Sequence, residues 1–322
     1  MTSTANARVR AALAEAAATK PEVVVVLLNY NRVEDSVECI ESVLVSEGPS
    51  SRVVVLDNGS KNDESLVLKK RFGESIDVLR SIKNLGVAAG WNMVISYSWE
   101  KYRPAHFFIL IDDMIVDRTA IKELRDFLLS RDDAGVAGLP IARLGSPDEF
   151  EDGRFNDLQE PTVDYLLLGG AMLIRSEIFE ALGMFDEEFF IHGEENDFMD
   201  RMRRSRWKPY LVPTHAKVYH KGKPSASGVS GFAAFHRTRN MLVLLRKDYA
   251  GVRLAKSLVR YFLRWLPMEM TKDIAHSGGF RNLKARGRGL ASGMAFLIRN
   301  GRGNRHLRRL GDGTFPEGVS EV

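Results

Sequence analysis

The chain has 322 residues, of which 44% are hydrophobic and 27% charged, and its formal net charge is +4. This length suits one large domain with an appendage, or two modest domains, and the composition is ordinary for a soluble globular protein. The single cysteine, Cys39, excludes an internal disulfide framework and fits a reducing compartment.

No stretch of the sequence has 18 consecutive uncharged apolar residues, so we expect no membrane-spanning helix. The first 20 residues lack the apolar core of a signal peptide because Glu15 interrupts them. We interpret residues 1–20 as an Ala-rich helix or a frayed arm, and we expect the protein in the cytoplasm.

Short apolar runs alternate with helical patterns in the first part of the chain. The runs are rich in β-branched residues, as in parallel strands that are buried on both faces. The segments between them repeat apolar residues at helical spacing. We predict strands at 23–28, 53–56, 77–80 and 107–111, and helices at 33–44, 88–99 and 119–129. This order predicts an α/β fold with a parallel, right-handed wound sheet.

The pattern changes after Pro140. Residues 143–161 are polar with Gly and Pro, so we predict a loop there. Gly169 and Gly170 form a pair that suits a bend or a close approach of the backbone to a ligand. Further strands are predicted at 207–212 and 216–219, and helices at 232–247, 252–270 and 282–299. We therefore divide the chain into an arm (1–20), an α/β domain (21–225) and a helical basic region (226–322).

Acidic residues follow two of the predicted strands. Asp57 ends RVVVLDN, and Asp112 and Asp113 end HFFILIDD. Carboxylates at the ends of buried strands are costly, and in an open α/β sheet that edge is where ligands bind. Asp57 can accept an N–H from a pyrimidine base, or it can form an Asx turn or a helix cap. Asp113 can bind a hard cation that bridges two phosphates, and its structural alternative is a helix N-cap.

The glycine-spaced segment NLGVAAGWN (residues 84–92) is not the dinucleotide-binding fingerprint. That pattern requires G-x-G-x-x-G directly after the first strand, where this chain has NYNRVEDS. The chain also has no G-x-x-x-x-G-K-[ST] motif. Hydride transfer and P-loop hydrolysis are therefore disfavoured.

A third acidic cluster begins the helix predicted after FFIHG. Acids at the start of this helix and arginines at its end complement the helix dipole. Two i,i+4 ion pairs are expected along it, Asp197–Arg201 and Asp200–Arg204. These pairs do not explain the adjacent Glu194 and Glu195, and one of these two is a candidate general base facing a cleft. His220, after the strand-like KVYH, is a candidate metal or pyrophosphate contact, and a structural histidine is the alternative.

The C-terminal region is strongly basic. From Arg281 to Leu310 the sequence has nine Lys or Arg residues and no acid, which fits an anionic membrane surface, an anionic acceptor, nucleic acid, or only a solvated helix. Aromatic and apolar residues lie among basic ones just upstream: Tyr261, Phe262, Trp265, Leu266 and Met268, beside Arg253, Lys256, Arg260 and Arg264. Such a helix can lie on an anionic membrane, or its aromatic face can pack on the α/β domain or a second subunit.

These motifs, in this order, resemble the bacterial family-two glycosyltransferases with the GT-A fold, of the rhamnosyl- and galactofuranosyltransferase type. The resemblance covers residues 22–245 and rests on VVVVLLNYNR, VVVLDNGS, NLGVAAGWN, and above all GGAMLIRSEIFEALGMFDEEFFIHGEENDFMDRM followed by VYH. It implies a GT-A type, Rossmann-like sheet that binds a nucleotide sugar, with residues 21–225 as the catalytic domain and a helical C-terminal extension.

The resemblance also implies roles for single residues. It assigns Asp57 to contact with the base of the nucleotide. The full set of residues assigned to donor binding is Asn29, Asp57, Asn58, Asn84, Gly86, Asp112 and Gly170. Glu195 matches the catalytic base and Glu194 its acidic neighbour. Asp113 matches the last acid of the D-x-D metal motif, and His220 matches the histidine near the metal and the diphosphate. The implied cofactor is Mg²⁺ or Mn²⁺.

One position departs from the pattern of the family. Ile111 stands where D-x-D begins, so Asp113 is left as the clear ligand. A register that places Met114 at the last acid would put the use of a metal in question.

We therefore expect an inverting glycosyltransferase that moves a sugar from a UDP or dTDP sugar to an acceptor hydroxyl. The acceptor stays open between a glycan, a lipid-linked molecule, a small molecule and a protein. Peripheral contact with the inner face of the membrane and a homo-oligomer through the C-terminal helices are further expectations, and nucleic acid is not an expected partner. The alternatives are a nucleotidyltransferase, for which NYNRVEDS is a poor phosphate loop, and a non-catalytic protein that binds anionic surfaces.

Overall fold

The computed structural model describes residues 20–150, 158–165, 170–222, 230–275, 279–299, 307–311 and 318–322. Almost all of the predicted N-terminal arm, and Gly169 of the glycine pair, lie outside these ranges. Within them, no helix is both long enough and apolar enough to cross a membrane.

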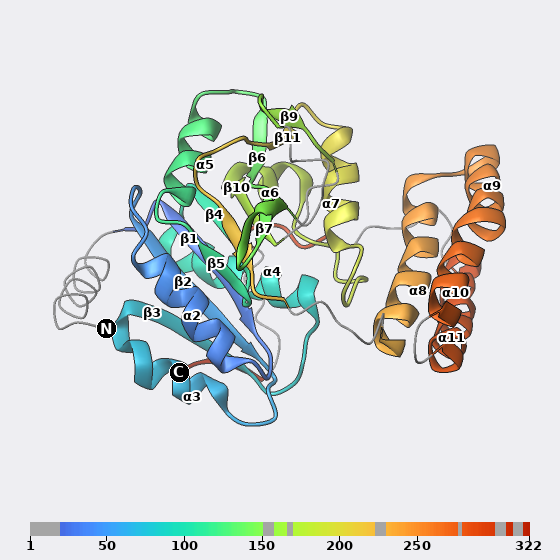
Figure 1. Ribbon diagram of the computed structural model, residues 1–322, viewed down its shortest axis with the longest axis horizontal. Coiled ribbons are helices and arrows are strands. Elements are labelled where there is room, and N and C mark those ends of the chain that lie inside the picture. Colours follow the sequence, from blue (N-terminus) through green and yellow to red (C-terminus); the bar gives the residue numbers. More distant parts are fainter. Residues whose placement is uncertain are drawn as a thin grey trace.

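The main sheet contains β1 (Val23–Asn29), β2 (Ser51–Asn58), β3 (Ile76–Ser81), β4 (His106–Ile111), β6 (Ala134–Gly138), β9 (Thr162–Val163), β10 (Ala171–Arg175), β11 (Lys208–Leu211) and β13 (Val319–Glu321). Their spatial order is β13-β3-β2-β1-β4-β10-β6-β11-β9 (Figure 1). Strands β3, β2, β1 and β4 are mutually parallel, as the sequence predicts. Beyond β4 the sheet is mixed, because β10 runs antiparallel to both β4 and β6.

Helices cover both faces of this sheet: α2 (Val33–Leu44), α3 (Glu64–Phe72) and α5 (Ala120–Leu129) on one, and α4 (Val87–Tyr102), α6 (Ser176–Leu182) and α7 (Glu194–Arg203) on the other. A short 3₁₀ turn, η1 (Gly73–Ser75), follows α3. Each face of the main sheet has its own hydrophobic core, and successive β1 side chains point to the two cores in turn. Val23 and Val25 pack on the α2 side, and Val24 and Val26 pack on the α4 side. A strand buried on both faces is apolar throughout, which explains the uninterrupted run of valines.

A second, four-stranded sheet holds β5 (Met114–Val116), β12 (Val218–His220), β7 (Ile141–Arg143) and β8 (Ser146–Phe150), in the order β5-β12-β7-β8. Strand β8 corrects part of the loop predicted at 143–161. In the antiparallel pairing of β12 with β5, His220 lies opposite Met114. This pairing brings the histidine to the end of β4, next to Asp113.

The C-terminal region forms a separate group of helices beside α7 (Figure 1). It contains α8 (Gly231–Asp248), α9 (Gly251–Arg260), the π-helical turn η3 (Tyr261–Trp265), α10 (Leu266–Ala275) and α11 (Gly279–Arg299). Leu242, Tyr261 and Leu266 form its own small core. The buried Arg286 of α11 pairs with Asp273 of α10 and donates to Thr238 of α8 (3.2 Å), so it ties three helices together.

The chain end departs from the helical prediction for 226–322. Strand β13 pairs antiparallel with β3 and covers that edge of the main sheet. An open edge strand exposes unpaired backbone groups, so covering it is favourable even when the added strand is short and polar. The division of the chain at residues 225 and 226 itself remains a prediction.

Candidate active site

A cavity of about 760 Å³ opens at the ends of β1, β2 and β4. Its other walls come from the loop before α4, the segment that leads into α7, and Phe232 of α8. The predicted site residues that line it are Asn58, Asn84, Gly86, Asp112, Glu194 and Glu195. Asn29, Asp57, Asp113, Gly170 and His220 lie outside its lining, although Asp113 and His220 adjoin it.

Asn58 fixes one wall of this cavity. Its amide nitrogen donates to the carbonyl of Gly86 (3.1 Å) and to Oδ1 of Asn84 (3.3 Å), and its own Oδ1 accepts the Leu85 N–H (2.9 Å). Gly86 has a φ of +84°, and a Cβ there would lie 2.5 Å from the Phe190 carbonyl oxygen. The wall is therefore shaped before any ligand binds, and residue 86 has to be glycine.

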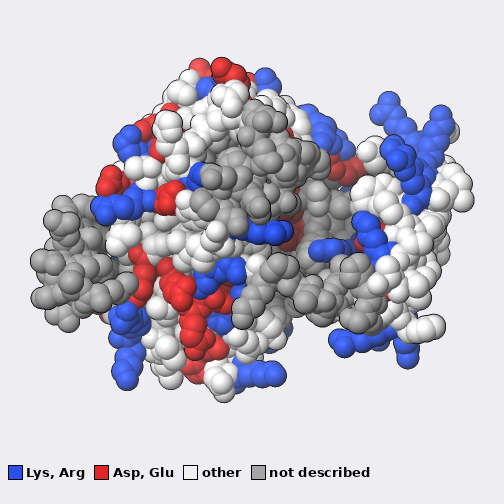
Figure 2. All heavy atoms as spheres, in the orientation of Figure 1, with Lys and Arg blue, Asp and Glu red and all other residues white. Residues whose placement is uncertain are grey.

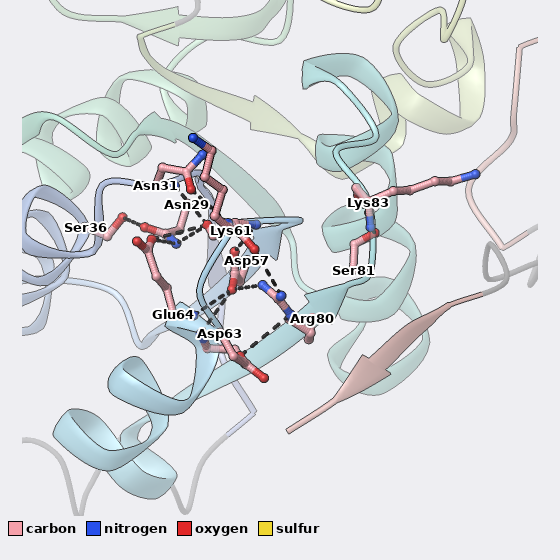
Figure 3. Close-up of polar contacts among 12 residues, drawn as sticks. Asn29, Asn31, Ser36, Asp57, Lys61, Asp63, Glu64, Arg80, Ser81 and Lys83 are labelled. Atoms are coloured by element: carbon pink, nitrogen blue, oxygen red, sulfur yellow. Dashed lines mark hydrogen bonds and ion pairs between the residues drawn. The ribbon is translucent and has the colours of Figure 1, made fainter.

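Asp57 is fully buried behind this wall and faces the start of α3 (Figure 3). Its Oδ1 accepts the Ser60 N–H (3.1 Å), and its Oδ2 accepts the N–H groups of Glu64 and Ser65 (3.1 Å each). The Arg80 guanidinium pairs with the same carboxylate. The structure thus shows the Asx turn and the helix-capping role, while contact with a base remains a prediction.

Asn29, like Asp57, is buried behind the cavity and bonds to neighbouring helices. Its side chain is fully buried, donates to Oε2 of Glu64 (2.8 Å) and accepts from the Ser36 hydroxyl (2.8 Å), as Figure 3 shows. These bonds join the end of β1 to α2 and α3. Gly170 also acts through packing, because a Cβ there would lie 2.7 Å from Cε of Met114.

Asp113 lies between two cationic groups. Its Oδ2 accepts from Arg32 (2.9 Å) and lies 3.2 Å from Nε2 of His220, whereas its buried Oδ1 has no hydrogen-bond partner. Burial raises the pKa of Asp113, but His220 and Arg32 together outweigh burial and hold that pKa below its ordinary value. For Asp112, which lines the cavity, burial outweighs the opposing Arg32 charge and raises the pKa to about 7.

These residues fit a divalent cation only in combination with a substrate. In the part of the chain that the structure describes, no group of three or more His, Cys, Asp or Glu side chains converges as a metal site. The unpartnered Oδ1 of Asp113 and the carboxyl group of Asp112 are the oxygen atoms on offer. Mg²⁺ commonly binds through one or two carboxylates, with the remaining positions filled by substrate phosphates and water.

Glu194 and Glu195 are the first residues of α7, and both line the cavity. The turn before them requires Gly193, whose φ is +113° and whose Cβ would lie 2.9 Å from the Phe189 ring. Glu194 is only 4% exposed, and its Oε2 has no hydrogen-bond partner. Burial, with the charge of Glu195, raises the pKa of Glu194 to about 8, so Glu194 holds its proton near neutral pH. Glu195, in contrast, is only partly buried, and two adjacent carboxyl groups that differ in burial suit one acid and one base.

Arg201 fixes the orientation of α7. It pairs with Asp197 (2.8 Å), as the sequence predicts, and donates to the carbonyls of Leu182, Gly183 and Met184 (2.7, 3.0 and 2.8 Å). The predicted pair Asp200–Arg204 is wrong: Asp200 pairs with Arg203, and Arg204 pairs with Asp248 of α8. The reason is that α7 ends at Arg203, so Arg204 lies on the chain that turns away.

The lining residues that the sequence predictions did not name include Arg32, Phe190, His192 and Phe232. His192 has a φ of +65°, which is uncommon for a residue with a side chain and marks a constrained position before α7. Burial lowers its pKa to about 4, with a further contribution from Arg237. The apolar FFIHG segment gave a signal for His192, but the approach of Phe232 depends on how α8 packs.

Comparisons with known proteins bear on the family of the chain. Residues 24–183 match the model of glycosyl transferase family 2. The dTDP-rhamnosyl transferase RfbF of Shigella flexneri is 25% identical over 224 residues, which cover 63% of this chain and 73% of that protein. The low-salt glycan biosynthesis hexosyltransferase Agl10 of Haloferax volcanii is 25% identical over 197 residues, covering 56% of this chain and 61% of that protein.

Solved structures show the same fold. TarS 1–349 of S. aureus in complex with UDP has a TM-score of 0.55 at 15% identity, covering 93% of this chain and 98% of that one. The mannosyltransferase PcManGT of Pyrobaculum calidifontis, in complex with GDP-Man and Mn²⁺, has a TM-score of 0.54 at 13% identity, covering 91% and 96% of the two chains. With its family-2 domain at residues 24–183, the chain belongs to the family-two glycosyltransferases and has their GT-A type fold.

Proposed function

We propose that the enzyme is an inverting glycosyltransferase that uses a UDP or dTDP sugar. One observation carries the proposal: the paired Glu194 and Glu195 line the same cavity as Asp112 and the Asn58–Asn84 wall. The candidate general base and the carboxyl ends of the parallel strands thus border one cavity of about 760 Å³. This volume suits a ligand of nucleotide-sugar size.

Glu195 is the general base of this proposal. It takes the proton of the acceptor hydroxyl as the oxygen attacks the anomeric carbon from the face opposite the diphosphate. The bond between that carbon and the diphosphate breaks, and the leaving group departs with the electron pair. General-base help of this kind is worth about 10²–10⁴-fold in rate. Glu194, neutral beside it, adds no second negative charge to the site.

The diphosphate is placed at the end of β4. Arg32, which lines the cavity, supplies a fixed positive charge there, and His220 holds the Asp113 carboxylate from the other side. A Mg²⁺ or Mn²⁺ ion held by Asp113 and Asp112 would neutralise charge that develops on the leaving diphosphate. The Mn²⁺ in the PcManGT complex supports this assignment.

The base of the nucleotide is placed against the Asn58–Asn84 wall. The names of a dTDP-rhamnosyl transferase and of a UDP complex among the similar proteins support a pyrimidine, whereas the PcManGT complex contains the purine nucleotide GDP-Man. A direct contact with Asp57 requires its carboxylate to exchange one of its present donors for the base N–H. Otherwise Asp57 and Asn29 act by positioning the neighbouring Asn58.

Peripheral contact with an anionic membrane at its inner face is also proposed, through α9 and η3. Val252, Val259 and Leu263 are 71%, 57% and 77% exposed. Exposed basic residues lie beside them: Arg253, Lys256, Arg260 and Arg264. Tyr261 and Leu266, in contrast, pack inside the core of the C-terminal helices themselves, and not on the α/β domain. A homo-oligomer through the same apolar side chains is the competing arrangement.

The test is a screen of sugar nucleotides for protection against thermal unfolding, with and without Mn²⁺. We expect a UDP or dTDP sugar to raise the melting temperature, and Arg32→Ala to reduce that shift. If no nucleotide sugar or nucleoside diphosphate protects the protein in either condition, the proposed donor site is wrong.

A further inference from the structure

The loop that leads into α7, residues 186–193, forms no helix or strand of its own. Three of its residues line the active-site cavity: Phe190, Ile191 and His192. Glu194 and Glu195 follow directly as the first residues of α7. A loop without helical or sheet hydrogen bonds has few internal restraints, so the place of both glutamates depends on what holds the loop from outside.

Asn240 of α8 binds this loop through two successive carbonyl groups. Its Nδ2 donates to the Ile191 carbonyl (2.9 Å) and to the His192 carbonyl (2.6 Å). Its Oδ1 accepts from Arg239 (2.8 Å), and because a guanidinium group can only donate, this bond fixes the direction in which the amide points. Asn240 is only 1% exposed and lies outside the lining of the active-site cavity, so it acts on the loop and not on a substrate.

The two carbonyls face the same side because of the backbone of His192. Its φ of +65° lies in the left-handed region, which is costly for a residue with a side chain and persists only where the surroundings enforce it. An extended residue at this position would turn one of the two carbonyls away from Asn240. The paired hydrogen bonds therefore select the left-handed turn, and Gly193 completes it with a φ of +113°. The direction in which α7 starts follows from this turn.

Two further residues of α8 pair with acids of the same loop. Lys247 pairs with Asp186, and these side chains are 2% and 5% exposed. Arg239 pairs with Glu188 and also donates to its carbonyl (3.1 Å). Figure 2 shows, in contrast, Lys and Arg side chains that project from the helical group with few acids beside them. Lys247, Arg239 and Asn240 thus hold the loop at three points, and the point that Asn240 holds is the one directly before the glutamates.

We propose that Asn240 is a positioning residue for Glu195. By binding two successive carbonyls, it holds the turn at His192 and Gly193 from which the two glutamates project. The inference rests on the proposed function, because it takes Glu195 as the base. The C-terminal helices thereby take part in the reaction without a contact between Asn240 and the substrate. A displacement of about 1 Å can lower a rate about 100-fold, so loss of the two bonds lowers turnover without loss of donor binding.

The test compares donor hydrolysis by the wild type and by Asn240→Leu, with water as the acceptor. The donor is UDP-glucose or dTDP-rhamnose, whichever stabilises the wild type more in the thermal screen. Leucine has nearly the shape of asparagine but no N–H groups, so the two carbonyls lose their partner. We expect kcat to fall about 10–100-fold, and the KM of the donor to stay within about threefold because the donor wall is unchanged.

Leu242→Ala, on the same helix, is the matched control. It removes part of the small core of the C-terminal helices but keeps Asn240. The free energy of unfolding should therefore fall, while kcat stays within about twofold of wild type. An equal loss of kcat in Asn240→Leu and Leu242→Ala would overturn the proposal, because the effect would then come from destabilisation alone.

A double-variant cycle shows whether Asn240 acts through Glu195. Once Glu195→Gln has removed the base, Asn240 has nothing left to position. Adding Asn240→Leu to Glu195→Gln should therefore lower kcat by no more than about twofold. Effects that multiply would contradict the proposal, since Asn240 would then act on the donor site or on the fold as a whole.

One readout needs no turnover. Burial lowers the pKa of His192 to about 4, with further contributions from Arg237 and His236. If Asn240→Leu releases the turn, water reaches the ring, and NMR titration should show the pKa of His192 rising towards its ordinary 6.5. An unchanged pKa would mean that Asn240 does not hold the turn. Asn240→Ala gives the same readouts where Asn240→Leu does not fold. If the wild type hydrolyses neither donor, the proposed function fails, and this titration still decides whether Asn240 holds the turn.

Discussion

Replacing Glu194 by glutamine tests whether this carboxyl group is buried as a neutral acid. Burial and the charge of Glu195 raise the Glu194 pKa from its ordinary 4.5 to about 8. In the unfolded chain the group ionises at its ordinary value. Between these two pH values the folded protein therefore holds a proton that the unfolded chain has lost, and raising the pH destabilises the fold.

The magnitude follows from linkage. One whole proton is worth about 1.4 kcal/mol of unfolding free energy per pH unit, so the loss between about pH 5 and about pH 8 is on the order of 2–4 kcal/mol. Glutamine at position 194 binds no proton in this range. Between the same two pH values, Glu194→Gln should therefore lose about 2–4 kcal/mol less unfolding free energy than the wild type. Any constant difference between the two proteins, such as a change in hydrogen bonding, does not affect this comparison of slopes.

The assay is urea unfolding of wild type and Glu194→Gln across this pH range. Glu180→Gln, which replaces an exposed acid on α6, is the matched control and should follow the wild type. If wild type and Glu194→Gln lose stability in parallel, Glu194 is ionised in the folded protein. The two glutamates would then be alike in charge, and the acid and base roles would have no basis in their environments.

Three further predictions concern the active-site cavity. Glu195→Gln should keep nucleotide affinity within about twofold and lower turnover at least about 100-fold in initial-rate assays; turnover within a few-fold of wild type would shift the base role to Glu194. In calorimetry with a nucleoside diphosphate and Mn²⁺, Asp113→Asn should weaken metal-dependent binding more than Asp112→Asn, and the opposite order would contradict the assignment of Asp113 as the main ligand. Asp57→Ala should lower the unfolding free energy by about 1–3 kcal/mol, because it leaves buried N–H groups unpaired, and it should weaken UDP binding more than ribose 5-phosphate binding; equal losses for the two ligands would confine Asp57 to supporting the fold.

The sheet could be predicted well because its signal is local. The valines of β1 form one uninterrupted run, and such a run reports burial on both faces whatever the rest of the chain does. Strand β13 carried no such signal, since Val319–Glu321 is short and mostly polar, and it forms only because β3 presents an open edge. Strand β8 was missed for the same reason, as it depends on pairing with β7.

Six of the predicted site residues line the cavity and five do not, and the roles of all of them stay predictions. The Asp113–His220 pair depends on β5 meeting β12, and the spacing of those segments in the sequence does not contain this contact. Arg32 also reaches Asp113 from a distant part of the chain, and the motif VVVVLLNYNR, which ends in Arg32, did not indicate this contact. The sequence allowed two roles for Asp57, contact with a pyrimidine base or a turn and helix cap. Its hydrogen bonds to the start of α3 show the second role directly. Phe232 could enter the account only after the packing of α8 was known.

The anomeric configuration of the released sugar tests the central claim most directly. Proton NMR in the first minutes of turnover, with water as the acceptor and a single-anomer donor from the thermal screen, distinguishes the two outcomes before mutarotation mixes them. The account predicts the anomer opposite to that of the donor, formed by wild type and strongly reduced in Glu195→Gln. A product that keeps the donor configuration would contradict direct attack by a hydroxyl that Glu195 activates, and with it the proposed mechanism.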